Sequence, residues 1–152
     1  KQYEVFKPAC NTNEINTCSQ EALNNVYDNT VVYTDSVLNG LIDTLKQQQN
    51  VNTALIYLSD HGESLGEKGL YLHGTPYAIA PKEQTHIQML FWANADFYQQ
   101  HGVQNTCLQN LANQPEVSQD NLFHTVLGGL NVHTQAYNGK LDVFHACSQG
   151  KA

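Results

Sequence analysis

The sequence contains no arginine, and its seven lysines are outnumbered by fourteen aspartate and glutamate residues, which gives a net charge of −7. A protein that binds nucleic acid presents a basic surface to the phosphate backbone, so this class of function is excluded. Charged residues of both signs make up only 14% of the chain, compared with about 25% in an average soluble domain. Asparagine and glutamine supply the polarity instead, as 31 of the 152 residues.

Long apolar runs are also missing. No stretch reaches the roughly 20 residues that a membrane-spanning helix needs, and no signal peptide opens the chain. The sequence therefore predicts no membrane span in this chain and leaves open an anchor in a longer parent protein. A length of 152 residues suits about one domain with a hydrophobic core. We expect residues 1–152 to form part of one domain, without a complete second domain.

The four cysteines, Cys10, Cys18, Cys107 and Cys147, include no C-x-x-C pair, so a structural zinc site is not expected. Their even number favours two disulfides, Cys10–Cys18 around a short polar loop and Cys107–Cys147. Disulfides would place the protein outside the cytosol. The alternative is four reduced, buried thiols.

Hydrophobic periodicity predicts an α/β fold. Apolar residues recur at helical spacing after Ser19, which suits the N-cap of a helix that ends near Lys46. Continuous apolar runs at residues 53–59 and 87–93 predict two buried strands, the first of them a central parallel strand. Further along, the sequence predicts a helix from Ser118 to about residue 127, stopped by two glycines, and a short edge strand at 132–137. Two buried strands are few for a parallel sheet, so we expect more of the sheet upstream and interpret the chain as a fragment.

The 27 residues between the two strands are too many for a passive connection, and they hold the most informative chemistry. Asp60, His61 and Gly62 follow the first strand directly, where ligands bind in open α/β sheets. Carboxylate oxygen and imidazole nitrogen are standard zinc ligands, and Gly62 would give the turn its conformational freedom. His73 and Glu63 add further donors on the same loop. The simpler alternative is that Asp60 caps a turn and the histidines are solvated.

A serine hydrolase is a competing interpretation. Residues 62–66, GESLG, match the G-x-S-x-G motif in which a serine nucleophile lies on a strand-to-helix turn. The glycines that follow Ser64 argue against a long helix there. Acidic and histidine residues that could complete a triad in the right chain order are Asp96, Asp120, His124, His133 and His145. His124 falls among apolar residues of the predicted helix, where a structural role is the commoner one.

The sequence resembles the catalytic domain of lipid A phosphoethanolamine transferases, the group that includes the mobile colistin-resistance enzymes. The resemblance is carried by LIYLSDHGESLGEKGLYLHGTPYAIAPKEQTH at residues 55–86. It is supported by FKPACNTNEINTC at 6–18, NVYDNTVVYTDSVLNGLID at 25–43 and SQDNLFHTVLG at 118–128. It extends from about Tyr3 to Cys147. It implies a three-layer α/β/α fold of the alkaline phosphatase and sulfatase type, of which this chain would be a C-terminal portion.

The resemblance also implies a reaction. Family members transfer phosphoethanolamine from phosphatidylethanolamine to lipid A through a covalent threonine intermediate, at the periplasmic face of the bacterial inner membrane. Asp60 and His61 match the zinc ligands of the family, and His73 matches a histidine that faces the phosphate. Glu63 matches an acidic residue that supports the catalytic centre from beside the metal ligands. Zn²⁺ would also explain phosphate chemistry without arginine, because a metal, lysine or backbone N–H groups must then neutralise the charge.

The match is incomplete in one respect. The threonine nucleophile and a zinc-binding glutamate of the family have no counterpart in this sequence, and Thr75 and Thr85 do not occupy the nucleophile position. We therefore expect the chain alone to be inactive, with an N-terminal half of the catalytic domain as its partner. The alternatives are a noncatalytic fragment and, less favoured, a serine hydrolase that uses Ser64.

Overall fold

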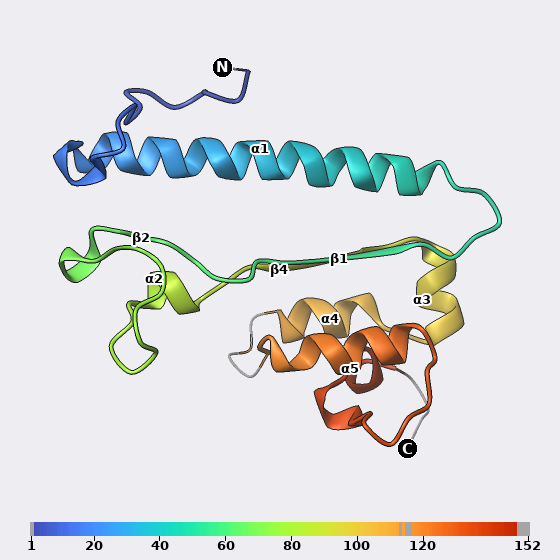
Figure 1. Ribbon diagram of the computed structural model, residues 1–152. Coiled ribbons are helices and arrows are strands. Elements are labelled where there is room, and N and C mark those ends of the chain that lie inside the picture. Colours follow the sequence, from blue (N-terminus) through green and yellow to red (C-terminus); the bar gives the residue numbers. More distant parts are fainter. Residues whose placement is uncertain (1, 113, 115–116, 149–152) are drawn as a thin grey trace. The chain divides into compact units, whose positions relative to one another are not determined.

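The computed structural model describes residues 2–112, 114 and 117–148. Figure 1 shows the order of the helices and strands along the chain. The chain divides into two compact units. The first comprises residues up to Gln47 and Ile56–Phe91, and the second comprises Gln48–Leu55 and residues from Trp92 onward. None of the helices in the described ranges is long and apolar enough to cross a membrane.

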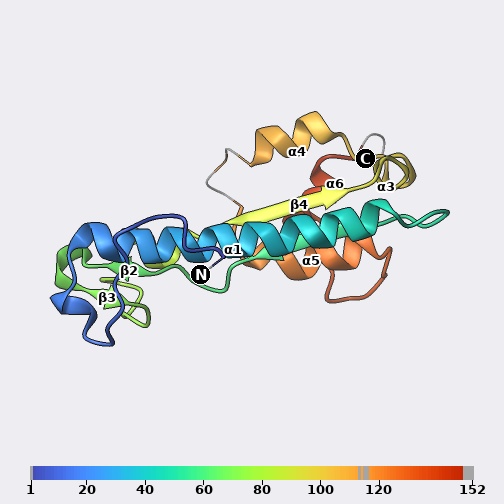
Figure 2. The same ribbon diagram turned by 90° about the horizontal axis from the view of Figure 1, so that it is seen from above.

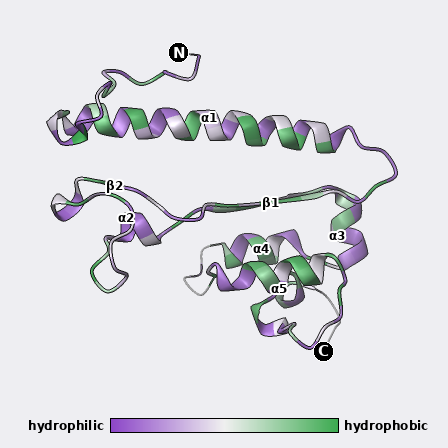
Figure 3. Cartoon of the chain, viewed as in Figure 1, coloured by the Kyte–Doolittle hydropathy of each residue, from purple (hydrophilic) through white to green (hydrophobic). Residues whose placement is uncertain are grey.

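Helix α1, Gln20–Lys46, confirms the longest predicted element. The Ser19 hydroxyl accepts a hydrogen bond from the backbone N–H of Ala22 at 3.2 Å, which satisfies one of the unpaired N–H groups at the start of the helix. Lys46 forms an ion pair with Asp43 at 3.0 Å in the last turn, where a cation also complements the helix dipole. Polar and apolar residues alternate along its length (Figure 3).

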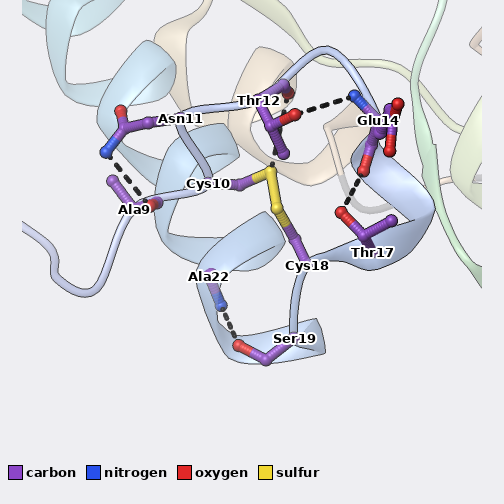
Figure 4. Close-up of a disulfide and its surroundings, with 9 residues drawn as sticks. All are labelled: Ala9, Cys10, Asn11, Thr12, Glu14, Thr17, Cys18, Ser19 and Ala22. Atoms are coloured by element: carbon purple, nitrogen blue, oxygen red, sulfur yellow. Dashed lines mark hydrogen bonds between the residues drawn. A yellow bond between two sulfur atoms is a disulfide. The ribbon is translucent and has the colours of Figure 1, made fainter.

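The disulfide Cys10–Cys18 closes the loop that precedes α1 and confirms the first predicted pair. A 3-10 helix, Ile15–Thr17, lies inside the loop. Threonine side chains hold it at both ends: the Thr12 hydroxyl accepts from the Glu14 N–H at 3.2 Å, and the Thr17 hydroxyl donates to the Glu14 carbonyl at 2.7 Å (Figure 4). The loop therefore leads directly into the Ser19 cap.

Strands β1, Ala54–Leu58, and β4, Met89–Ala93, confirm both predicted strands and pair with each other. The Ser59 N–H donates to the Gln88 carbonyl at 3.1 Å, and the Asn94 N–H donates to the Thr53 carbonyl at 3.0 Å. As the residue number rises along β1, that of its partner in β4 falls, so the two strands are antiparallel. The prediction of a parallel arrangement is wrong for this pair. Both strands are also mostly half-buried, with Ala93 the one buried residue of the two, so the predicted burial is not confirmed either. A continuous apolar run carries no information on the direction of the neighbouring strand.

The long connection between β1 and β4 is ordered. Strands β2, Ser64–Leu65, and β3, Tyr71–Leu72, form an antiparallel pair around the 3-10 helix Glu67–Gly69, and helix α2, Lys82–Thr85, follows (Figure 2). The Gln20 amide donates to the Leu65 carbonyl at 2.9 Å and ties this pair to the start of α1.

The second unit is helical, with the elements α3 (Ala95–His101), α4 (Asn105–Leu111), α5 (Asp120–Gly129), the 3-10 helix Gly139–Leu141 and α6 (Val143–Ala146). Its buried apolar residues include Phe97 and Phe144, whose rings meet edge to face at 5.6 Å. The second predicted disulfide, Cys107–Cys147, is confirmed and joins α4 to the end of α6.

Three features of this unit differ from the sequence predictions. The predicted cap Ser118 lies one residue before the observed N-cap, Gln119, although its hydroxyl accepts a hydrogen bond from the Asp120 N–H at 3.2 Å. Helix α5 continues through Gly128 and Gly129. A Cβ on Gly128 would overlap the carboxylate of Asp142, so this glycine serves close packing and does not end the helix. The predicted edge strand at 132–137 is wrong, because these residues form an irregular segment with one turn, closed by a hydrogen bond from the Tyr137 N–H to the Thr134 carbonyl at 3.1 Å.

Candidate active site

A tight turn, residues 60–63, follows β1 and holds three of the four predicted site residues. The Asp60 carboxylate accepts a hydrogen bond from the His61 N–H at 3.0 Å, and the Ser59 hydroxyl donates to the His61 carbonyl at 2.7 Å. The turn is thereby fixed from both sides by local hydrogen bonds. The Asp60 side chain is 89% exposed and that of His61 is 39% exposed, so both are accessible to a ligand.

The orientation of the His61 ring defines its chemistry. Its Nδ1 lies 3.0 Å from the carbonyl oxygen of Gly62. Because a carbonyl can only accept, Nδ1 carries the proton in this hydrogen bond and Nε2 keeps its lone pair. Nε2 lies 3.7 Å from Oδ2 of Asp60. Two ligands of a tetrahedral zinc ion with bonds near 2.0–2.1 Å are about 3.3 Å apart, so these two atoms could bind one Zn²⁺ ion at an angle wider than the tetrahedral one, or after a small shift of either side chain.

Glu63 and His73 form the second part of the site. Nδ1 of His73 lies 2.6 Å from Oε1 of Glu63, the geometry of a charge-assisted hydrogen bond. The rings of His61 and His73 lie 3.8 Å apart between centroids at an interplanar angle of 30°. Donor atoms of His61, Glu63 and His73 all lie within 4.8 Å of one another, so these three residues could also hold a cation.

One carboxylate oxygen in this cluster is unsatisfied. Oε2 of Glu63 is buried and has no hydrogen-bond partner among the residues that the structure describes. A buried acceptor without a partner costs free energy unless a ligand, a proton or a cation satisfies it. The cluster is therefore built to accept a further positive or hydrogen-bonding group.

Gly62 is required in this turn for a reason other than the predicted one. Its φ angle lies outside the left-handed region, so conformational freedom is not the requirement. A Cβ on this residue would overlap the carbonyl oxygen of Glu83, and its N–H donates to the carbonyl of Gln84 at 3.0 Å. The segment before β4 thus packs directly onto the backbone of the turn.

The structure argues against Ser64 as a nucleophile. The residue is only 1% exposed, lies in β2, and accepts a hydrogen bond from Nε2 of Gln84 at 2.8 Å. No helix follows it directly, so the strand-to-helix turn of serine hydrolases is absent. His124 has the structural role expected, because its Nδ1 accepts from the Asn138 N–H at 3.0 Å.

Sequence reasoning missed Gln84, which is 6% exposed and bonds to Ser64 and to Thr75. Only its position between a proline and the second strand marks it, and that signal does not distinguish it from other polar loop residues.

Comparison with known proteins assigns the chain to a family. Residues 1–132 match the family model described as Sulfatase. Phosphoethanolamine transferase EptA of Salmonella typhimurium is 50% identical over 147 residues, which cover 96% of this chain and 27% of that protein.

Solved structures agree with this assignment. The soluble domain of lipooligosaccharide phosphoethanolamine transferase A from Neisseria meningitidis has a TM-score of 0.93 and 43% identity over 99% of this chain and 45% of that chain. The C-terminal periplasmic domain of phosphoethanolamine transferase EptC from Campylobacter jejuni has a TM-score of 0.85 and 44% identity over 99% of this chain and 47% of that chain.

The chain belongs to the sulfatase family, and the predicted α/β fold of the sulfatase type is confirmed. Its resemblance to phosphoethanolamine transferases is confirmed as well. The chain spans about a quarter of the length of the curated relative, with 27% coverage, and under half of each structural neighbour.

Proposed function

We propose that this chain is part of a zinc-dependent phosphoethanolamine transferase that moves phosphoethanolamine from phosphatidylethanolamine to a phosphate group of lipid A. Its similarity to enzymes of this name supports the reaction class. One observation in the site carries the proposal: Nε2 of His61 and Oδ2 of Asp60 converge at 3.7 Å, and the bond from Nδ1 to the Gly62 carbonyl leaves Nε2 able to bind a metal.

Asp60 and His61 would be the zinc ligands from this chain. Bound Zn²⁺ would lower the pKa of an attacking hydroxyl and neutralise phosphoryl oxygens, the task for which this sequence has no arginine. The Gly62 carbonyl holds the imidazole in the metal-binding tautomer, a role that outer hydrogen-bond partners commonly play at zinc sites.

His73 would act on the phosphate group. Its Nδ1–H donates to Glu63 at 2.6 Å, which fixes the orientation of the ring and leaves Nε2 available. Nε2 can then hold a proton and donate it to a phosphoryl or leaving-group oxygen, or bind a second metal ion together with Glu63. Glu63, next to the zinc ligands, would assist His73 in either role. Its Oε2, which has no hydrogen-bond partner among the described residues, could accept a hydrogen bond or bind the metal ion.

The threonine nucleophile would come from polypeptide outside residues 1–152. Thr75 is unsuited to the role, because its N–H and its hydroxyl both bond to the Gln84 side chain, at 3.2 and 3.1 Å. The remaining part of the catalytic domain is thus the expected partner of this chain, and we interpret the chain as the C-terminal part of that domain.

The two disulfides suit an oxidising compartment, and one structural neighbour is a periplasmic domain. We therefore place the reaction at the periplasmic face of the inner membrane, with the membrane anchor in the parent protein. The transferred group carries an ammonium, which lowers the negative charge of lipid A. This change would weaken binding of cationic polymyxins such as colistin.

The test uses the full-length protein with Asp60→Ala, His61→Ala and a control, His133→Ala. His133 is an exposed histidine of the second unit. Metal content is measured by mass spectrometry of the purified proteins, and transfer by the mass increase of lipid A on incubation with phosphatidylethanolamine. We expect the two ligand variants to lose zinc and transfer, and the control to keep both. Full zinc content and activity in either ligand variant would refute the assignment.

A noncatalytic fragment is the remaining alternative. Native mass spectrometry of the purified protein separates the two interpretations. A complex of this chain with a companion polypeptide and zinc supports the transferase, whereas a metal-free chain whose mass rises with concentration supports a self-associating fragment.

A further inference from the structure

Gln84 is a buried polar residue that belongs to none of the groups assigned so far. It lies in α2 and is only 6% exposed. Its carboxamide forms three hydrogen bonds: Nε2 donates to the Ser64 hydroxyl at 2.8 Å and to the Thr75 hydroxyl at 3.1 Å, and Oε1 accepts from the Thr75 N–H at 3.2 Å. Both ends of the amide are therefore committed to protein partners.

These partners are direct neighbours of the site residues. Ser64 follows Glu63 in the chain, and Thr75 lies two residues after His73. The Gln84 side chain thus bridges the segment that carries Glu63 and the segment that carries His73. A single amide joins two loops whose side chains meet at 2.6 Å.

The backbone of Gln84 adds a third connection. Its carbonyl accepts from the Gly62 N–H at 3.0 Å, next to His61. The preceding carbonyl, that of Glu83, fills the space where a Cβ on Gly62 would lie. Side chain and backbone of one residue therefore hold the turn with His61 and Glu63, the strand that follows this turn and the loop with His73.

The loop around His73 needs such support. Leu72 and Gly74, on either side of His73, have φ angles of +63° and +90°. The His73 side chain is 51% exposed, and the strand before it contributes only two paired residues. The pairing of Ser64 with Leu72 holds the loop on the N-terminal side of His73, and the Gln84 amide, bonded to Thr75, holds it on the C-terminal side.

We propose that Gln84 is a positioning residue that sets the separation of His73 from His61 and Glu63. It does not contact the reacting atoms. The expected effect of Gln84 on activity rests on the proposed transferase function, whereas its effect on the separation of these side chains does not. Buried hydrogen-bond networks of this kind specify one arrangement of side chains because every donor and acceptor has its partner. Loss of such outer support costs roughly 10–100-fold in metal affinity or activity at comparable sites.

The experiment compares Gln84→Met, Gln84→Glu and Lys82→Gln in the full-length protein. Methionine keeps the side-chain volume and removes all three hydrogen bonds, whereas glutamate keeps the acceptor for the Thr75 N–H. Lys82 lies in the same helix with its side chain 85% exposed and serves as the control. Nitrogen-15 NMR of the histidine rings reports the bonded Nδ1–H of His73, and zinc affinity and kcat for transfer are measured in parallel.

We expect Gln84→Met to keep the wild-type circular dichroism spectrum, to lose the bonded Nδ1–H signal of His73, and to lower kcat by about 10–100-fold. Gln84→Glu should retain part of the signal and of kcat, and Lys82→Gln should retain both. A folded Gln84→Met protein with an unchanged His73 signal would overturn the proposal.

Two further outcomes are distinguishable. If Gln84→Met does not fold, Thr75→Ser, which keeps the hydroxyl, and Thr75→Ala, which removes it, decide the question: equal His73 signals in these two would overturn the proposal. If the wild-type protein transfers no phosphoethanolamine, the transferase function fails. A response of the His73 signal to Gln84→Met would still establish the positioning role.

Discussion

The carbonyl oxygen of Glu83 occupies the place where a side chain on Gly62 would begin. This relationship makes Gly62→Ala a sharp test of the turn. We expect the variant to lower the free energy of unfolding by about 1–3 kcal/mol, because the added methyl group forces the backbone of 83–84 away. Zinc binding should weaken with it. Denaturant unfolding measures the first effect and metal titration the second.

Gly40 provides the matched control. It lies inside α1, and a Cβ there would meet no atom within 4 Å. Gly40→Ala should raise the free energy of unfolding by about 0.5–1 kcal/mol through helix propensity. Equal effects of the two substitutions would contradict the packing described for Gly62.

The bond between Glu63 and His73 predicts a loss of rate without a loss of the first metal ion. Glu63→Gln keeps the shape of the side chain and removes the charge, which weakens the hydrogen bond to Nδ1 of His73. We expect transfer to slow by roughly 10–100-fold, while zinc content remains near the wild-type value. Glu83→Gln, on the neighbouring helix, is the control. A loss of zinc as large as in His61→Ala would instead make Glu63 a ligand.

Tyr137 donates a hydrogen bond to Oδ2 of Asp142 at 2.6 Å, and Asp142 is only 2% exposed. Burial of the phenol, followed by this hydrogen bond and the negative charge of Asp142, raises the pKa of Tyr137 to about 12. Its neutral form is therefore favoured in the folded protein. The resulting stability is complete below about pH 10, the pKa of an unperturbed tyrosine, and is lost as the pH rises toward 12.

Tyr137→Phe should remove the part of the stability loss at alkaline pH that comes from ionisation of Tyr137. At neutral pH it should lower the free energy of unfolding by about 1.5–3 kcal/mol, the usual range for a hydrogen bond to a charged group. Tyr77→Phe, at a position that is 86% exposed, should change neither the stability loss at alkaline pH nor the free energy of unfolding at neutral pH. Unfolding at a series of pH values from neutral to alkaline, with tyrosinate absorbance as a second signal, checks both statements.

The two disulfides should contribute unequally to stability. Cys107–Cys147 closes a sequence separation of 40 and Cys10–Cys18 one of 8. Chain entropy then predicts about 4 kcal/mol for the first and about 2.5 kcal/mol for the second. Replacing each pair by serine and comparing denaturant midpoints tests this order. A larger loss from the Cys10–Cys18 pair would show that native contacts of that loop outweigh chain entropy.

Elements whose formation depends on residues close together in the sequence could largely be predicted. The Ser19 cap and the helical spacing of apolar residues located α1 to within a residue at each end. Helix α3 was missed although its signals were present. Asn94 caps it by accepting from the Phe97 N–H, and Gly102 ends it in the left-handed conformation. At 7 residues it is too short for periodicity to show.

Among nonlocal features, the Cys107–Cys147 disulfide could be predicted from the even number of cysteines, but strand pairing and the contacts within the site could not. The antiparallel pairing of β1 with β4 depends on the path of the chain between them, which the apolar pattern of either strand does not encode. In the site, the position of Asp60 and His61 followed from the end of a strand. The 2.6 Å approach of His73 to Glu63 depends on the Gln84 bridge, and no spacing in the sequence reveals which amide forms it.

The disulfide between Cys107 and Cys147 makes a covalent ring of the chain that includes α5 and α6. A protease that cuts one peptide bond anywhere inside this ring releases nothing. The cut protein keeps its full mass on a non-reducing gel and separates into two bands only after a reductant is added. On a gel, a single cleavage within the segment is therefore visible only after reduction.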